Sequence, residues 1–156
     1  MFTVLLAAAS YLLMEPVTYG THRFVMHGIG LRLHRSHHRR DSTGWEANDA
    51  FPVVFAASAM IATAAAYGGL TGRWVLAVVV GVTLYGASYA LVHDLYIHRR
   101  LPLFHRRYAV LDRLAEAHRI HHLYHGEPYG MLVPIVPAEL RRRAAHTEPD
   151  PVTRVL

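Results

Sequence analysis

Residues 74–92 read WVLAVVVGVTLYGASYALV, a run of nineteen residues without a charged side chain. Residues 51–67, FPVVFAASAMIATAAAY, form a second uncharged run, and a third apolar segment begins at residue 2. A helix needs about 20 apolar residues to cross a bilayer, so each central run predicts a membrane-spanning helix. The N-terminal segment lacks the clear basic region and cleavage site of a secretory signal, which indicates a retained first membrane helix.

The composition agrees with a membrane protein. Hydrophobic residues make up 53% and charged residues 17% of the 156-residue chain, and that charged share is low for a soluble domain. We therefore expect an all-α fold, an integral membrane helical bundle with apolar helices at about residues 2–27, 51–67 and 74–98. The membrane domain is expected to span residues 1–138, and a polar, mobile tail to occupy residues 139–156.

The distribution of charge predicts the orientation of the chain. The net charge is +5, every Lys/Arg cation is an arginine, and of the sixteen arginines only Arg73 lies between the two central runs. The other arginines flank or follow the histidine motifs described next, so the positive-inside tendency places those motifs on the cytoplasmic side of the cytoplasmic membrane. Topology and anionic lipid headgroups account for the basic charge, which argues against nucleic acid as a partner.

Ten of the thirteen histidines form four motifs that alternate between a pair and a triplet. The motifs are His22-x4-His27, His34-x2-His37-His38, His93-x4-His98 and His118-x2-His121-His122. Neutral imidazole is the commonest metal ligand in proteins, and no structural need calls for this repetition. Ten imidazoles exceed the needs of one ion, so the motifs predict a site for two metals with about five ligands each.

Helical spacing predicts how each motif presents its rings. Positions i, i+3 and i+4 share one face of a helix, so each triplet can supply up to three nitrogens to one pole of a metal site. The pairs are less obvious, because five residues of an ideal α-helix turn about 500° and leave the two rings roughly 140° apart. Either each pair straddles two metals, or a π-bulge brings both rings onto one face.

Other polar residues near these motifs are candidates for supporting roles. Asn48, Asp49 and Asp94 can accept the second N–H of a metal-bound histidine, although ordinary surface polarity explains them equally well. Glu15 lies within an apolar helix, where a carboxylate is costly and tends to be functional. We expect Glu15 either to support the metal site or to bond inside the helical bundle.

Three histidines fall outside the motifs. His125 extends the last triplet without fitting the pattern, and the isolated His105 and His146 are expected to be surface or hydrogen-bonded residues. The chain contains no cysteine, which excludes disulfides, iron–sulfur clusters and thiolate-ligated haem.

Several segments resemble those of a known family. They are Met26-His27-Gly28, His34-Arg35-Ser36-His37-His38, Asn48-Asp49, His93-Asp94 and Ala117-His118-Arg119-Ile120-His121-His122. Together they resemble the bacterial β-carotene hydroxylases of the fatty acid hydroxylase superfamily, over about residues 12–137. All four histidine motifs match in order and spacing, so the resemblance implies that the ten motif histidines ligate two non-haem iron ions.

The resemblance also implies an activity. The enzyme would be an O2-dependent monooxygenase that hydroxylates C3 of a β-ionone ring, converting β-carotene to β-cryptoxanthin and then to zeaxanthin. Such a substrate is dissolved in the bilayer and must reach the metals from there. Small residues of the two central runs are candidates for a slot, although plain helix packing explains most such residues. These candidates are Ala56, Ala57, Ala64, Gly81 and Gly86.

The two electrons that this reaction needs are expected to come from another protein. No flavin, nicotinamide or haem motif is visible in the chain, so a ferredoxin-type donor is the expected partner. The arginines on the cytoplasmic side can dock an acidic partner. Arg99 and Arg100, which follow the third apolar helix, are the candidates for that contact.

Two other functions remain open at the level of sequence. A hydroxylase or desaturase of another membrane lipid, such as a fatty acid or a sterol, uses the same metal chemistry. Desaturases with histidine motifs are usually longer, however, and lack this alternation of pairs and triplets. A histidine-rich metal transporter would need ligands near the bilayer midplane, whereas the central runs contain no histidine.

Overall fold

The computed structural model describes residues 1–39 and 45–147, and all regular secondary structure within these ranges is helical. Three segments are long and apolar enough to cross a membrane: Phe2–Ile29, Ala47–Tyr67 and Trp74–Ile97. Their mean hydropathies are 1.3, 1.7 and 2.1. The predicted all-α membrane bundle is confirmed, and the observed spans agree with the expected ones to within a few residues.

Each membrane segment joins an α-helix to a helix of another type. The first consists of α1 (Phe2–Gly20) and the π-helix η1 (Thr21–Ile29). The second consists of the 3-10 helix η2 (Ala47–Asp49) and α3 (Ala50–Tyr67). The third consists of α4 (Trp74–Ala90) and the π-helix η3 (Leu91–Ile97).

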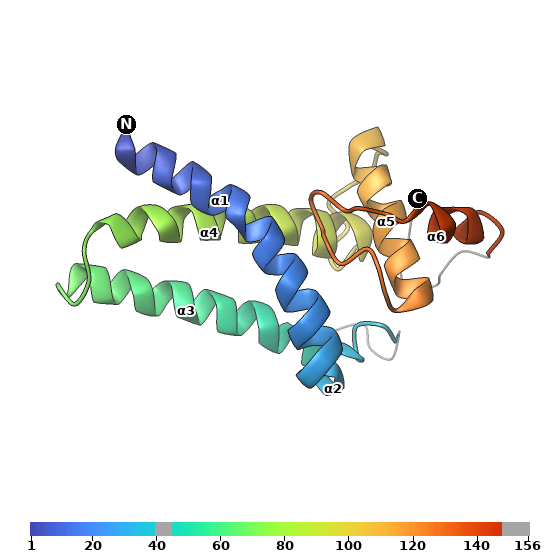
Figure 1. Cartoon of the computed structure of the whole chain (residues 1–156), viewed down its shortest axis with the longest axis horizontal. Helices are drawn as coiled ribbons and strands as arrows, with labels where there is room; N and C mark the ends of the chain where they lie inside the picture. Colours follow the sequence, from blue (N-terminus) through green and yellow to red (C-terminus); the bar gives the residue numbers. More distant parts are fainter. Residues whose placement is uncertain (40–44, 148–156) are drawn as a thin grey trace.

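The central helix of the bundle is α4, because both α1 and α3 pack against it (Figure 1). The turn between α3 and α4 passes through Gly69 at a φ of 75°, a left-handed conformation that glycine adopts without strain. A Cβ atom on Gly81 would lie 2.2 Å from the backbone oxygen of Ala7 in α1. Small residues permit such close approach of membrane helices, so Gly81 serves helix packing.

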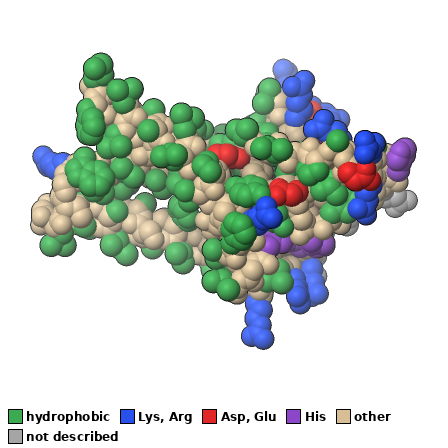
Figure 2. Space-filling view, in the orientation of Figure 1, with side chains coloured by type: hydrophobic (Ala, Val, Ile, Leu, Met, Phe, Trp, Pro, Cys, Tyr) green, Lys and Arg blue, Asp and Glu red, His purple; other side chains and the backbone are tan. Residues whose placement is uncertain are grey.

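The surface of the three long helices suits a lipid environment. Large apolar side chains project outward along them, and Val4, Leu12 and Met60 are 72%, 70% and 72% exposed. Figure 2 shows hydrophobic side chains covering this part of the molecule, whereas most arginine, acidic and histidine side chains gather at the opposite end. The molecule therefore has an apolar bundle and one polar end.

Short helices and loops build the polar end. The chain bends at Gly28, whose φ of −104° and ψ of −114° are not helical, and then forms α2 (Leu31–His34). Further along the chain, α5 (Ala109–Tyr124) packs against η3. A small core joins η3, α5 and the loop that follows α5, and it consists of Val92, Tyr96, Ile97, Ala115 and Met131.

The expected mobile tail at residues 139–156 begins with a packed helix, α6 (Ala138–Ala144). Arg119 of α5 donates a hydrogen bond to the backbone oxygen of Ala144 at 3.1 Å, and Ala144 is buried. This part of the expected tail is thus folded against α5. The mobility expected for residues 148–156 lies outside the described residues, as does the connector at residues 40–44.

Candidate metal centre

Both histidine pairs lie on π-helices. His22 and His27 belong to η1, while His93 lies in η3 and His98 directly follows it. Hydrogen bonds of a π-helix join residues five apart, and the backbone N–H of His98 donates to the carbonyl of His93 at 2.9 Å. The structure therefore selects the second of the two geometries considered for the pairs, in which both rings of a pair share one face.

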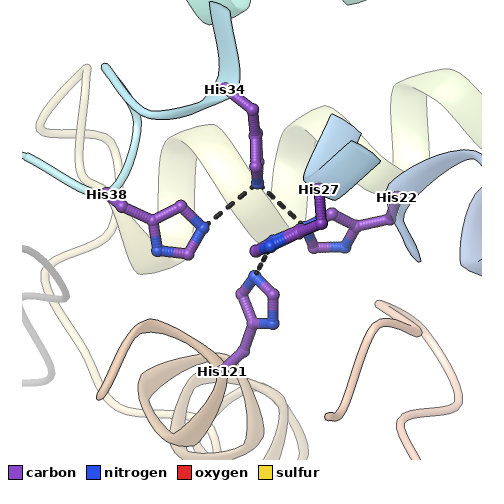
Figure 3. Close-up of side chains that lie close together, drawn as sticks. All are labelled: His22, His27, His34, His38 and His121. Carbon is purple, nitrogen blue, oxygen red and sulfur yellow. Dashed lines mark hydrogen bonds between the residues drawn. The ribbon is translucent and has the colours of Figure 1, made fainter. Parts of the chain in front are cut away.

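Nine of the ten motif histidines gather into two clusters, within each of which the candidate ligand nitrogens lie within 4.8 Å of one another. The first cluster consists of His22, His27, His34, His38 and His121. The second cluster consists of His37, His93, His98 and His118. Figure 3 shows the five rings of the first cluster, which point toward a common centre from different elements.

Each triplet is divided between the two clusters, which differs from the expectation that a triplet serves one pole. His34 and His38 belong to the first cluster, whereas His37 between them belongs to the second. In the other triplet, His118 belongs to the second cluster and His121 to the first. The middle histidine of each triplet therefore crosses over, and each cluster draws ligands from both halves of the chain.

His122 lies between the clusters. It is buried, and its ring centroid is 4.6 Å from that of His118, 5.2 Å from that of His98 and 4.4 Å from that of His38. His38 has the same place in its triplet, four residues after His34. By this correspondence His122 is the counterpart of His38 on the side of the second cluster.

The Nε2 atoms face one another inside both clusters. The closest pairs, at 3.0–3.1 Å, are His22–His34, His34–His38, His27–His121, His37–His93 and His98–His118. Two nitrogens about 2.1 Å from a shared ion lie about 3.0 Å apart at a right angle and about 3.4 Å apart at a tetrahedral angle. The donor set and its spacing fit metal ions with more than four ligands.

The Nδ1 atoms of several rings point outward and hydrogen-bond to the protein. In the first cluster His22, His34 and His121 bond to neutral oxygens. The acceptors are Tyr129 O at 3.0 Å, Asn48 Oδ1 at 2.7 Å and Gly126 O at 2.6 Å. Such bonds fix the tautomer that leaves Nε2 available to a metal, so the rings are oriented for metal binding.

In the second cluster the outward acceptors are carboxylates. His93 Nδ1 lies 2.9 Å from Asp94 Oδ1, and His37 Nδ1 lies 3.2 Å from Glu46 Oε2. Asn48 and Asp94 thus contact histidines as expected. Asp49 does not, because it accepts a hydrogen bond from Arg100 at 2.7 Å and one from the backbone of Glu46 at 2.9 Å.

The sequence profile of the fatty acid hydroxylase family matches residues 7–137. The chain belongs to the fatty acid hydroxylase family. The beta-carotene hydroxylase of Pseudescherichia vulneris is 40% identical over an alignment of 154 residues, which covers 93% of this chain and 85% of that protein. The beta-carotene hydroxylase of Paracoccus sp. (strain PC1) is 38% identical over 128 residues, which are 80% of this chain and 77% of that protein.

A plant protein is similar as well. The chloroplastic beta-carotene 3-hydroxylase 1 of Arabidopsis thaliana is 32% identical over 136 residues, which are 83% of this chain and 43% of that protein. No solved structure matches the chain. Family membership and the two histidine clusters together establish a metal-binding hydroxylase of the membrane.

Burial favours the neutral form of several imidazoles in this hydroxylase. Desolvation lowers the pKa of His37, His118 and His121 well below the usual value, and the neighbouring histidines lower it further. Burial also lowers the pKa of His34 to about 4. A metal ligand must be deprotonated, so these rings are ready to bind metal at neutral pH.

A cavity of about 390 Å³ opens between α1, α3 and α4 of the hydroxylase and extends to the second cluster. Met14, Phe55 and Tyr89 line it, and His93 and Asp94 form part of its wall. Both α1 and α3 pack on α4, but within the described ranges they make little contact with each other. The cavity therefore joins the apolar region of the bundle to a candidate metal ligand.

The small residues expected to form a substrate slot divide into two groups. Ala56 and Gly86 line the cavity, and a Cβ atom on Gly86 would meet nothing within 4 Å. Ala57 and Ala64 are not part of its wall, and Gly81 packs against α1. Close packing against α1 thus explains the glycine at position 81, as the alternative to a substrate slot proposed.

The remaining histidines do not join either cluster. His105 and His146 are exposed, as expected. His125 ends α5 in a left-handed conformation with a φ of 53°, and its ring centroid lies 4.7 Å from that of His38. His125 therefore lies next to the first cluster, but its ring nitrogens are not among the candidate metal ligands of that cluster.

The carboxylate of Glu15 bonds within the bundle, which agrees with one of its two expected roles. It accepts hydrogen bonds from the backbone N–H groups of Met131, Leu132 and Val133 at 2.9, 3.1 and 2.9 Å. The loop held in this way carries the Gly126 and Tyr129 carbonyls described above. Glu15 thus anchors a loop that orients two rings of the first cluster.

Three groups that contact the clusters were not expected from sequence. Glu46 precedes Asp49 by three residues, and the two side chains form a capping box around η2; that spacing is a recognisable signal. The carbonyls of Gly126 and Tyr129 are backbone atoms, so no residue type marks them. Arg100, considered above for donor docking, also forms ion pairs with Asp49 at 2.7 Å and Glu46 at 3.5 Å.

Proposed function

We propose that this chain is a di-iron β-carotene 3-hydroxylase, which converts β-carotene to β-cryptoxanthin and zeaxanthin with O2 and two external electrons. The observation that carries the proposal is the cavity between the membrane helices, which ends at His93 of a buried histidine cluster. The similarity to proteins named beta-carotene hydroxylases supports the choice of substrate.

The ten motif histidines are the proposed iron ligands. The first cluster would hold one iron through His22, His27, His34, His38 and His121. The second would hold the other through His37, His93, His98, His118 and, by its correspondence with His38, His122. When bound, the iron pair supplies the redox chemistry that activates O2 and oxidises an unactivated C–H bond.

The protein's own contribution is to place the ring and to keep water away from it. A β-ionone ring is apolar, and a cavity of about 390 Å³ is within the range of ordinary small-molecule sites. Phe55 and Tyr89 would hold the ring in the cavity, while the polyene chain would leave between α1 and α3 toward the lipid. The C3 carbon would then face the second cluster.

The topology follows from the arginines. The polar end with both clusters would lie on the cytoplasmic side of the cytoplasmic membrane, and Arg73 in the turn between α3 and α4 would lie on the other side. Residues 1–138 would form the hydroxylase domain. Electrons would come from a ferredoxin-type donor, which an arginine-rich surface can attract.

The first test is pigment chromatography of a bacterial host that makes β-carotene and expresses the chain. We expect β-cryptoxanthin and zeaxanthin with the wild type and only β-carotene with His121→Ala. If an iron-loaded wild type leaves β-carotene unchanged in the membrane even with a ferredoxin and its reductase supplied, the carotenoid assignment is wrong. Hydroxylation of another membrane lipid should then be sought by mass spectrometry.

A further inference from the structure

The two clusters differ in the charge of the groups that hold their outward nitrogens. In the first cluster the acceptors are the Asn48 side-chain oxygen and the carbonyls of Gly126 and Tyr129. Within the described residues no carboxylate is hydrogen-bonded to a ring of this cluster. In the second cluster both of these acceptors are carboxylates, Asp94 and Glu46.

The carboxylates near the second cluster are only partly exposed and share a nearby arginine. Arg100 pairs with Asp49 at 2.7 Å and more distantly with Glu46 at 3.5 Å. The Arg100 guanidinium therefore pairs with two carboxylates, and the carboxylate of Asp94 is engaged by His93. The side chains of Glu46 and Asp49 are 18% and 10% exposed, so bulk water screens their charges only in part.

A carboxylate acceptor changes the imidazole that donates to it. A metal-ligating histidine that gives its N–H to a carboxylate becomes a more basic ligand, and removal of such an acceptor typically costs 10–100-fold in metal affinity. A neutral carbonyl fixes the tautomer equally well but adds no negative charge. Two clusters with similar ligands can therefore hold their metals with different strength.

We propose that the two metal positions are inequivalent, and that Glu46 and Asp94 act as positioning residues that make the second cluster hold its metal more tightly. The inference rests on the proposed two-iron function. It assigns a role to two carboxylates that do not themselves ligate, and it orders the sites: the second cluster is the last to lose its iron.

The test is a chelator challenge of the full-length protein in detergent, loaded anaerobically with ⁵⁷Fe(II). Iron release to a ferrous chelator is followed by absorbance, and the retained iron by Mössbauer spectroscopy. We expect two phases of one equivalent each, with the slow phase at least 10-fold slower, and a distinct spectrum for the slowly released iron.

Conservative variants assign the phases. Glu46→Gln and Asp94→Asn should each accelerate the slow phase about 10–100-fold and leave the fast phase unchanged. The reverse change, Asn48→Asp, gives His34 of the first cluster a carboxylate acceptor and should retard the fast phase. Glu139→Gln on α6, whose side chain is exposed, is the matched control and should change neither phase.

The outcomes separate this inference from the proposed function. Binding of fewer than two irons by the wild type would contradict the two-iron proposal itself. Two irons released in one phase, or a fast phase that responds to both Glu46→Gln and Asp94→Asn, would overturn the inference and leave the two-iron proposal standing. Since Glu46 also caps η2, Asp94→Asn decides the matter if Glu46→Gln fails to fold.

Discussion

The carboxylate of Glu15 in α1 accepts a hydrogen bond from the hydroxyl of Tyr85 in α4 at 2.6 Å. Together with the three backbone N–H groups of residues 131–133, this bond places a fully engaged carboxylate inside an apolar bundle. The loop that it anchors begins directly after α5 and supplies the carbonyls that orient His22 and His121. A carboxyl side chain of a membrane helix thus connects helix packing to the geometry of the first cluster.

Replacement of Glu15 by leucine should destabilise the protein and loosen the first cluster. Each N–H that loses its partner in a buried setting costs about 1–3 kcal/mol. Thermal unfolding in detergent should show a lower midpoint, and metal analysis should show loss of the more weakly held iron. Glu15→Gln keeps an acceptor oxygen and should be milder, and Tyr85→Phe milder still. A Glu15→Leu protein with wild-type stability and iron content would rule out this role.

His37 and His121, the middle residues of the two triplets, belong to different clusters, so their replacement should remove different metals. His37→Ala should deplete the second cluster and His121→Ala the first, so each should lower bound iron from two equivalents toward one and abolish hydroxylation. His105→Ala, at an exposed position outside the clusters, is the control. Iron content and product yield are the measurements, and normal values for both in either variant would remove that histidine from the site.

Substitution of two glycines of α4 should have different effects, one on activity and the other on stability. Gly86 lines the cavity and has room for a side chain, so Gly86→Leu should fill the substrate space while iron content and folding stay normal. Gly81→Ala should instead force α1 away from α4, at about 1–3 kcal/mol of stability. Hydroxylation assays and unfolding midpoints distinguish these effects. Full activity of Gly86→Leu would show that the ring does not use this cavity.

The spans and the gathering of the motif histidines could be predicted from sequence because both depend on local patterns. Long runs without charge, such as residues 74–92, indicate a membrane-spanning helix directly. The histidine motifs indicate metal binding by their residue type and spacing. The division of each histidine triplet between the two clusters could also have been predicted from sequence. His37 and His38 are consecutive and hence about 100° apart on a helix, enough to aim at different metals.

The rest depends on contacts between distant segments. Nothing in the residue types of Gly126 and Tyr129 shows that their carbonyls face histidines 5 and 107 residues away. The π-helical form of η1 and η3 was one of two alternatives, because the spacing His-x4-His fits either. Only the fold brings Glu46 to His37 and gives the two clusters different acceptors.

The low pKa of the buried imidazoles predicts acid sensitivity of the iron-free protein. The ordinary pKa is 6.5, and burial lowers that of His34 to about 4. Below pH 6.5 the His34 ring binds a proton in the unfolded chain but stays neutral in the folded protein. The free energy of unfolding therefore decreases as pH falls from 6.5 toward 4. The loss approaches about 1.4 kcal/mol per pH unit for one such group.

Unfolding midpoints of the iron-free protein should therefore fall between pH 7 and pH 5. The iron-loaded protein should show a smaller change near pH 6, because bound metal favours the same neutral form. An iron-free midpoint that stays constant or rises over this interval would contradict the burial of neutral histidines at both clusters.

Binding of the electron donor is best tested at exposed arginines whose replacement should not disturb the fold. Arg100 pairs with Asp49 and Glu46, and two guanidinium nitrogens of Arg99 are buried, so charge reversal at either would disturb the fold. Arg32 and Arg35 are exposed beside the clusters. The double variant Arg32→Glu/Arg35→Glu should lower ferredoxin-dependent turnover about tenfold at low salt, because electrostatic attraction raises the rate of encounter.

The same pair of substitutions should have little effect at high salt, where exposed charges are screened. Arg73→Glu is the matched control, since Arg73 lies in the turn between α3 and α4, at the far end of the bundle from both clusters. Turnover should be measured against donor concentration at several ionic strengths. An equal loss from Arg73→Glu, or a loss that persists at high salt with iron content intact, would show that this surface does not receive the donor.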